Sequence, residues 1–310
     1  MSPEMIIPVL AAAVQCGTPI LFATLGEVIT ERAGILNLGV EGMMIVGAFV
    51  AFLVTYWTGS PWLAVMAGGF AAGMMGLLHG IVCIIFQGNQ VVSGLALTIF
   101  GTGLANYLGT PFLGVSSEGF SSFAIPFLSD IPVIGKIFFQ HDALVNLSYV
   151  LPFIIWLVIE RTSWGLALRA TGEYPEAAAA AGINPRFVRW CAVFIGAFLV
   201  GIGGAYLSLA YTHIWANNMT AGRGWIAVAL VIFAFWRSGR AVFGAYLFGG
   251  VMAFQLRFQA MGTSIPSSLL LMLPYALTIL VLLVSTMRSK GRAHGVAAPA
   301  ALGINLGPKV

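Results

Sequence analysis

Residues 161–190 read RTSWGLALRATGEYPEAAAAAGINPRFVRW and form the longest polar stretch in a chain that is otherwise almost entirely apolar. Its centre predicts a short helix. Pro175 suits the first helical position, Glu176 suits the positive end of the helix dipole, and Gly182 suits the position that follows the last turn. Asn184 followed by Pro185 predicts that a second helix begins there. The stretch is either a stiff element that contacts a partner or an ordinary basic loop.

The segments around this stretch are exceptionally apolar. Charged residues make up 8% of the chain and hydrophobic residues 59%, whereas a soluble domain has about 25% charged residues. Apolar runs of about 20 residues follow one another, and each is long enough to span a bilayer. The composition predicts an all-α, polytopic helical membrane protein with about nine transmembrane helices, within a range of eight to ten. The expected spans are approximately 5–29, 36–57, 62–86, 91–112, 143–159, 187–211, 225–236, 241–260 and 268–286.

Two features leave the number of spans open. Pro8 and Pro19 lie in the first span, where proline kinks or breaks a helix, and a break would raise the count to ten. The run 225–236 is short for a span. We expect residues 1–290 to form a single transmembrane domain and residues 291–310 to form a poorly ordered tail.

Basic residues predict the orientation, because loops on the cytoplasmic side carry an excess of Lys and Arg. Alternating spans place the loop 161–190, the loop around Arg237 and Arg240, and the beginning of the tail on one side. The long loop 113–142 lies on the other side, together with several acidic residues. The loop 161–190 and the C-terminus are therefore expected in the cytoplasm, and the loop 113–142 outside the cell.

Small residues in the third span form a periodic pattern. Gly69, Gly73, Gly76 and Gly80 recur at intervals of three and four residues and so share one helix face. Such a face lets another helix approach closely. We interpret it as a packing surface rather than a ligand site.

Polar residues inside apolar spans are the candidates for a solute path, because they are costly there and tend to mark such paths. Asn37 and Glu41 are expected on one face of the second span, Asn89 and Gln90 at the start of the fourth, and Asn106 further along it. The alternative is that these groups satisfy one another or the backbone. For Arg257, in the eighth span, we expect a structural or interface role near the outer membrane edge.

Several classes of function are disfavoured by missing motifs. The chain has no G-x-x-x-x-G-K-[ST] phosphate loop and no H-E-x-x-H pair, so we expect neither a nucleotide cofactor nor a metal on this chain. Cys16, Cys83 and Cys191 are far apart and lie in apolar runs, which is typical of packing residues. No catalytic cluster stands out, which disfavours a membrane enzyme, and nothing indicates a nucleic-acid partner.

Long motifs carry a resemblance to a known family. The segment GEVITERAGILNLGVEGMMIVGAF (26–49) resembles the opening signature of ABC importer permease subunits in the superfamily of ribose and branched-chain amino-acid permeases. Within that superfamily, the similarity is greatest to nucleoside-type permeases linked to basic-membrane-protein-type binding proteins. Further matching segments are NQVVSGLALTIFGTGL (89–104), LSDIPVIG (128–135), WGLALRATGEYPEAAAAAGIN (164–184), LAYTHIWANNMTAGRGWIAVALVIF (209–233) and PAALG (299–303). The segment RSGRAVFGAY (237–246) departs from the usual apolar sequence of the family.

The resemblance implies a mechanism and a set of partners. It implies alternating access in a bacterial cell (inner) membrane, with nucleosides as the expected solute. The implied partners are ABC ATPase subunits that bind ATP and Mg²⁺, a second permease subunit in a homo- or heterodimer, and an external binding lipoprotein or periplasmic protein. It also implies that the central loop contains a coupling helix that contacts the ATPase. The residues expected to couple are Gly172, Glu173, Pro175, Glu176, Ala178, Ala179 and Gly182.

Two other functions remain open from the sequence. One is an ABC permease of the same superfamily that carries simple sugars. The other is a stand-alone ion-coupled secondary transporter in which Glu41 binds the coupling ion.

Overall fold

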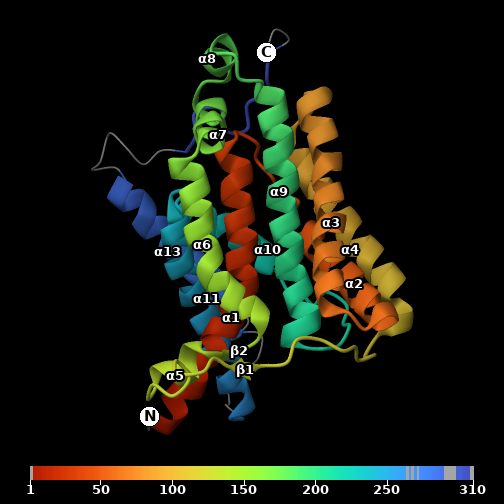
Figure 1. The fold of residues 1–310 in the computed structure, drawn as a ribbon, viewed down its shortest axis with the longest axis vertical. Helices are drawn as coiled ribbons and strands as arrows, with labels where there is room; N and C mark the ends of the chain where they lie inside the picture. The colour runs from red at the N-terminus through yellow and green to blue at the C-terminus, as the bar shows by residue number, and fades with distance from the viewer. Residues whose placement is uncertain (1–2, 263–264, 267–268, 271, 290–297, 308–310) are drawn as a thin grey trace.

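The computed structural model describes residues 3–262, 265–266, 269–270, 272–289 and 298–307. Within these residues the chain is predominantly helical (Figure 1). The long helices are α1 (Pro3–Arg32), α2 (Val40–Thr58), α3 (Pro61–Gly80), α4 (Gln90–Gly109), α6 (Ala143–Arg161), α9 (Pro185–Tyr206), α11 (Ser238–Ala260) and α13 (Leu273–Ser289). The shorter ones are α5 (Ile134–Phe138), α7 (Ser163–Glu173), α8 (Pro175–Ala180), α10 (Arg223–Ala234), the 3₁₀ turn η2 (Thr110–Phe112) and the π-turns η1 (Ile81–Ile85) and η3 (Leu207–Tyr211).

Seven helices among the described residues are long and apolar enough to cross a membrane. They correspond to the first six expected spans and the eighth. The seventh expected span is the 12-residue helix α10, about 18 Å long at 1.5 Å per residue, which is shorter than a bilayer core. The ninth overlaps α13, but some residues of the preceding segment lie outside the described ones. The multi-pass helical class is confirmed, whereas the count of nine spans is not.

The first helix is continuous. It runs through both Pro8 and Pro19 to Arg32 without a break, so the described chain gives no tenth span at that position. Its N-terminal end lies next to α5, and its C-terminal end lies next to α7 (Figure 1). We call the side with α5 the α5 end. We call the opposite side, where α7 leads into α8, the α8 end. The loop 113–142, with the two-stranded pair β1 (Phe123–Ala124) and β2 (Gln140–His141), covers the α5 end.

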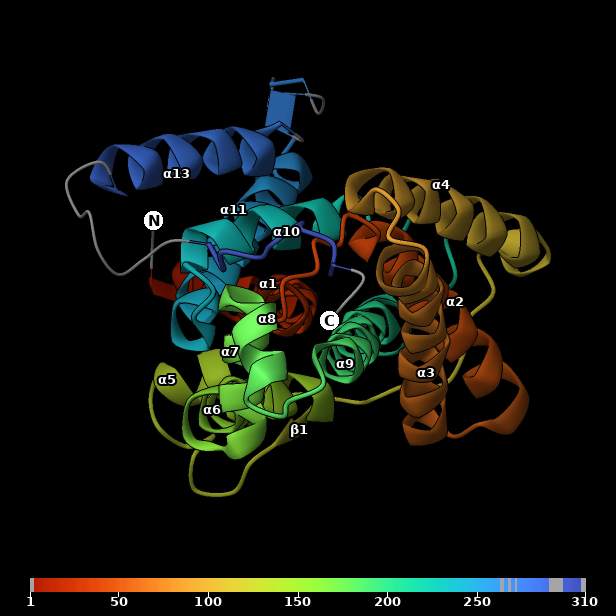
Figure 2. The same ribbon diagram turned by 90° about the horizontal axis from the view of Figure 1, so that it is seen from above.

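Helices α1 and α9 lie side by side at the centre of the bundle (Figure 2). Helix α1 packs against α10 and α11, and α9 packs in the same way against α2 and α3. Helix α4 then lies on α2, as α13 lies on α10. The chain therefore repeats one packing scheme, with α1 to α4 in the first copy and α9, α10, α11 and α13 in the second.

The glycine stripe of α3 is a packing surface, as its spacing predicts. An added Cβ at Gly69 or Gly73 would collide with the ring of Phe198 or Phe194, and one at Gly80 would collide with Trp190. All three rings belong to α9. The missing side chains thus let two long helices approach closely over several turns.

One prediction about the second span is wrong. Asn37 does not share a helix face with Glu41, because α2 begins only at Val40. Asn37 lies in the preceding connection, and its side-chain oxygen accepts a hydrogen bond from the Gly39 N–H at 2.9 Å. An Asn side chain that bonds the backbone two residues ahead stabilises a turn instead of a helix, which explains the later start.

Candidate functional site

The central polar stretch folds as its end signals predict. Helix α8 begins at Pro175 and ends at Ala180, and Gly182 follows with φ at +84°. Glycine reaches this left-handed conformation at little cost, which allows a sharp exit from the helix. Asn184 then caps α9, because its side-chain oxygen accepts from the Phe187 N–H at 3.1 Å. Figure 1 shows α8 projecting beyond the ends of the long helices.

Only one side of α8 is available to a partner. Pro175 and Ala178 are buried and seat the helix on the body of the protein. Glu176, Ala177 and Ala180 are exposed, and Ala179 is half-buried. The surface that α8 offers therefore consists of small side chains and one carboxylate, and Ala178 faces inward.

The last described segment, residues 298–307, is bound to the α8 end, so the expectation of a poorly ordered tail is wrong for these residues. The Ala301 N–H donates to the Gly172 carbonyl at 2.8 Å, and the Ala300 N–H donates to the Glu173 carboxylate at 3.2 Å. The Gly303 N–H donates to the Gly34 carbonyl at 3.2 Å. We call residues 298–307 the C-terminal strap. It connects the residues just before α8 to the connection between α1 and α2.

Arg189 fixes the strap from the side of α9. Its side chain is fully buried; Nε donates to the Ala33 carbonyl at 3.0 Å, and Nη1 donates to the Ile304 carbonyl at 3.0 Å. Its Nη2 has no hydrogen-bond partner among the described residues. A buried guanidinium is costly unless its N–H groups are hydrogen-bonded. The two backbone bonds of Arg189 therefore link α9 both to the strap and to the α1–α2 connection.

Two of the expected path residues also act at this end. Gln90 is buried; its side-chain oxygen accepts from the Leu36 N–H at 2.8 Å, and its Nε2 donates to Asn305 of the strap at 3.1 Å. Asn89 caps α4 by accepting from the Val92 N–H at 3.0 Å. In this conformation the hydrogen bonds of both side chains go to backbone groups or to the strap.

Glu41 lies at the N-terminus of α10. Its Oε1 accepts from the Thr220 hydroxyl at 2.6 Å and the Gly222 N–H at 2.9 Å, and its Oε2 accepts from the Gly224 N–H at 2.7 Å. Gly224 lies in the first turn of α10, where backbone N–H groups have no partner within the helix. Glu41 stands in the first turn of α2, so this one side chain joins the starts of α2 and α10.

Asn37, in the connection just before α2, is bonded to α1. Its backbone N–H and its Nδ2 donate to the two carboxylate oxygens of Glu27, each at 3.2 Å, and both residues are buried. Asn106 is elsewhere, where it exchanges two hydrogen bonds with Asn218 at 2.8 and 3.1 Å. The five expected path residues are thus divided among three places in the fold.

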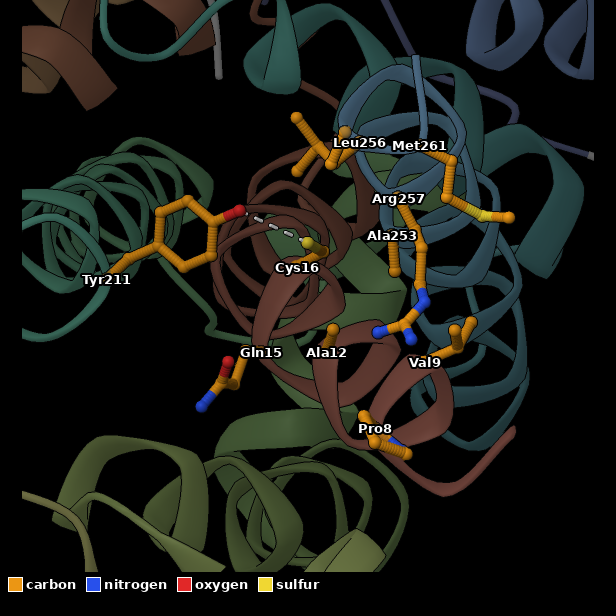
Figure 3. Close-up of a pocket in the computed structure, with 11 residues that line it drawn as sticks. Pro8, Val9, Ala12, Gln15, Cys16, Tyr211, Ala253, Leu256, Arg257 and Met261 are labelled. Atoms are coloured by element: carbon orange, nitrogen blue, oxygen red, sulfur yellow. Dashed lines mark hydrogen bonds between the residues drawn. The ribbon is translucent and has the colours of Figure 1, made fainter. Parts of the chain in front are cut away.

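A pocket of about 450 Å³ opens between α1 and α11, near the end of η3 (Figure 3). Most of its lining is apolar, and its polar groups are Gln15, Cys16, Tyr211 and Arg257. The Tyr211 hydroxyl points to the Cys16 thiol, 3.4 Å away. The Arg257 guanidinium has no hydrogen bond or ion pair to any residue that the structure describes, whereas the Arg257 backbone carbonyl accepts from the Met261 N–H. Among the described residues, the pocket therefore combines an apolar wall, one aromatic ring and one cation without a side-chain partner.

The sequence did not indicate Gln15 or Tyr211, and for Arg257 it indicated a structural or interface role instead of a place in a pocket. A signal for Arg257 existed, because a charge within an apolar helix usually faces a cavity or a partner. For Gln15 and Tyr211 the sequence carried no comparable signal, because the pocket forms only when α1, η3 and α11 meet.

Comparison with known proteins gives consistent matches. Residues 9–282 match a family described as the permease component of branched-chain amino acid transport systems. The putative glucose ABC transporter permease protein TsgC13 of Haloferax volcanii is 44% identical over 83% of this chain and 79% of its own length. The nucleoside ABC transporter permease protein NupC of Lactococcus lactis is 36% identical, over 86% and 88%. The guanosine ABC transporter permease protein NupQ of Bacillus subtilis is 33% identical, over 88% and 90%. No solved structure matches the chain.

Proposed function

The chain belongs to the family of permease components of branched-chain amino acid transport systems, and from this premise we propose that it imports nucleosides. It is a membrane-spanning permease subunit of an ABC transporter, like the relatives that it matches over most of their length. The observation that carries the proposal is the similarity to two permeases named for nucleoside and guanosine transport. The remaining arguments come from the geometry of the bundle.

The pocket beside Arg257 supports a solute that carries a base. Its wall is mainly apolar, and the Tyr211 ring, which has the Arg223 guanidinium 5.7 Å from its centre, adds an aromatic surface against which a nucleobase can pack. Gln15, the Tyr211 hydroxyl and Arg257 supply the few hydrogen-bonding groups that orient a ligand in such a pocket. A free sugar has hydroxyl groups on all sides and would leave several of them without partners on this wall.

A simple sugar is the second candidate. The relative named as a putative glucose permease is 44% identical to this chain, which is more than either nucleoside relative. The pocket chemistry and the relative's name thus favour different solutes, and only uptake measurements distinguish them.

Energy for transport would come from partner subunits. We propose that ATPase subunits carrying ATP and Mg²⁺ contact the exposed side of α8, that a second permease subunit completes the path, and that an external binding protein delivers the solute. The basic residues at the α8 end support a cytoplasmic position for that end. In this arrangement Gly172 and Glu173 act through the C-terminal strap, whereas Glu176, Ala177, Ala179 and Ala180 form the contact surface.

Glu41 and its neighbours would shape the path without binding an ion. Both carboxylate oxygens of Glu41 are occupied by donors from the start of α10. A coupling carboxylate in a secondary transporter needs free coordination sites, which supports an ATP-driven permease over a stand-alone carrier. Asn37, Asn89, Gln90 and Asn106 would likewise hold the elements that border the path.

The test is an uptake assay in cells that lack this chain and receive it back on a plasmid. Uptake of radiolabelled guanosine, uridine, glucose, ribose and leucine is measured for the intact chain and for Arg257→Gln and Tyr211→Ala. We expect the intact chain to restore guanosine and uridine uptake and both variants to reduce it. Arg186→Gln, on the exposed start of α9, serves as the control with the same change of charge. If the intact chain restores only glucose uptake, the sugar candidate replaces the nucleoside one.

A further inference from the structure

A second pocket lies at the α8 end, between the end of α6 and the connection from α10 to α11. It measures about 570 Å³. Its lining residues are Trp156, Ile159, Glu160, Arg161, Trp236, Arg237, Ser238, Gly239 and Arg240. Neither the coupling helix nor the pocket beside Arg257 contributes to it. Its position at the ends of two spanning helices puts it at the level of a membrane surface.

The charge of this pocket is strongly positive. Glu160 is the one carboxylate among the lining residues that the structure describes, and this group already pairs with Arg169 at 3.0 Å and with Arg32 at 3.6 Å. Arg161, Arg237 and Arg240 are exposed, and none of the three pairs with a carboxylate in the part of the chain that the structure describes. A planar guanidinium group binds two oxygens of a phosphate at once. Two of these guanidinium groups lie over aromatic rings, Arg161 over Trp156 and Arg240 over Phe235. Because none of the three has a described carboxylate partner, the hollow fits a phosphate-bearing ligand.

Aromatic rings accompany these cations. The Arg161 guanidinium lies 5.5 Å from the centre of the half-exposed Trp156 ring. Trp236 forms a buried part of the wall, and its N–H donates to Glu31. Tryptophan is enriched at the level of lipid head groups, where its ring meets the apolar core and its N–H meets the polar layer. The aromatic lining thus distinguishes this pocket from a purely soluble, charged contact surface.

Apolar surface continues from the pocket into the membrane-spanning region. Helices α6 and α11 contact each other. On α6, Phe153 lies one turn farther from the α8 end than Trp156. It is 61% exposed, and its ring centre is 5.7 Å from that of Trp156. On α11, Phe243 lies one turn farther from the α8 end than Arg240 and is 67% exposed. Leu247 follows on the same face. The cationic pocket therefore lies at the α8 end of two exposed apolar surfaces, one on α6 and one on α11. We call these the apolar stripes.

We infer that this pocket binds an anionic phospholipid. The phosphate of its head group would lie between Arg161, Arg237 and Arg240, and its acyl chains would cover Phe153 and Phe243. An acidic surface of a partner protein could use the cations, but it would leave the apolar stripes without an occupant. The inference is independent of which solute the protein carries.

The test is native mass spectrometry of the purified full chain after exchange into mixed micelles that contain dioleoyl-phosphatidylglycerol or dioleoyl-phosphatidylcholine. We expect the anionic lipid to remain bound preferentially. In Arg237→Gln and Arg240→Gln, and in the variant with both changes, its retention should fall roughly fivefold for each arginine removed. Retention of the zwitterionic lipid should not change. Both side chains are exposed, so the variants should keep the melting temperature of the parent chain.

The matched control is Arg186→Gln combined with Lys136→Gln, which removes two exposed charges away from the pocket. Equal loss of lipid in the control and in the pocket variant would overturn the inference, because it would reflect net charge alone. Displacement of the bound lipid by millimolar inorganic phosphate would also overturn it and would assign the pocket to a free anion. So would unchanged lipid retention in a pocket variant that no longer pulls down the partner ATPase.

Discussion

The Glu41 carboxylate accepts a hydrogen bond from the Gly224 N–H at 2.7 Å and thereby joins the first turn of α2 to the first turn of α10. The two helices belong to different copies of the repeated packing scheme. One side chain thus sets the relative position of both halves of the bundle at the point where two helices begin.

The first prediction tests this junction. Glu41→Gln should lower the free energy of unfolding by about 1–3 kcal/mol, because an amide NH₂ group would face N–H donors that then lose their acceptor. The measurement is thermal melting of the purified protein in detergent. The control is Glu118→Gln, a change of an exposed carboxylate in the loop 113–142. Equal melting temperatures for the two variants would contradict a structural role for Glu41.

The second prediction concerns Arg189 and the C-terminal strap. Arg189→Gln should leave the Ile304 carbonyl without its buried donor and release the strap from α9. Hydrogen–deuterium exchange of the peptide that contains Ala301 and Gly303 should then become faster, because both amides are bonded to the body of the protein. Arg186→Gln, three residues earlier and exposed, should leave the exchange unchanged. If the two variants exchange alike, Arg189 does not hold the strap.

The third prediction concerns the exit from α8. Gly182 has φ at +84°, where a β-branched side chain is strained by roughly 1–2 kcal/mol. That cost is small for the whole bundle, so Gly182→Val should reach the membrane at normal levels. The displaced α8 should nevertheless abolish solute-stimulated ATP hydrolysis by the reconstituted complex. Gly182→Asn should preserve stimulation, since asparagine tolerates the left-handed region. Full stimulation in Gly182→Val would show that α8 is only a connector.

The fourth prediction separates the two sides of α8. Ala177 is exposed, so Ala177→Arg adds a long cation to the surface that a partner would meet, without disturbing the core. We expect it to reduce pull-down of the ATPase subunit while the melting temperature of the permease stays unchanged. Ala178 is 3% exposed, so Ala178→Arg should instead lower the melting temperature. Unchanged pull-down with Ala177→Arg would place the ATPase contact elsewhere.

The fifth prediction concerns orientation. In a variant without Cys16, Cys83 and Cys191, single cysteines are introduced at Ser121 and Ser163, which are both exposed. An impermeant thiol reagent applied to intact cells should label the cysteine at 121 and not the one at 163, because the basic α8 end is expected in the cytoplasm. The reverse labelling pattern would invert the proposed topology.

The sequence alone predicted a large part of this protein. Composition and run length predicted the helical membrane class, and glycine spacing predicted the face of α3 that packs on α9. Pro175, Gly182 and Asn184 predicted α8 and the start of α9. These features could be predicted because each depends on contacts between residues close in the chain or on the average polarity of a segment.

Only the tertiary structure decided where the polar groups lie. Asn37 and Glu41 share a helical spacing in sequence, yet one bonds α1 and the other bonds the start of α10. The expected tail folds back because Gly172, Gly34 and Arg189 offer it partners from three different elements. The two pockets likewise combine side chains from helices that are distant in sequence, such as Gln15 with Arg257. Periodicity describes one helix at a time, whereas a buried polar group must find a partner that the whole fold supplies.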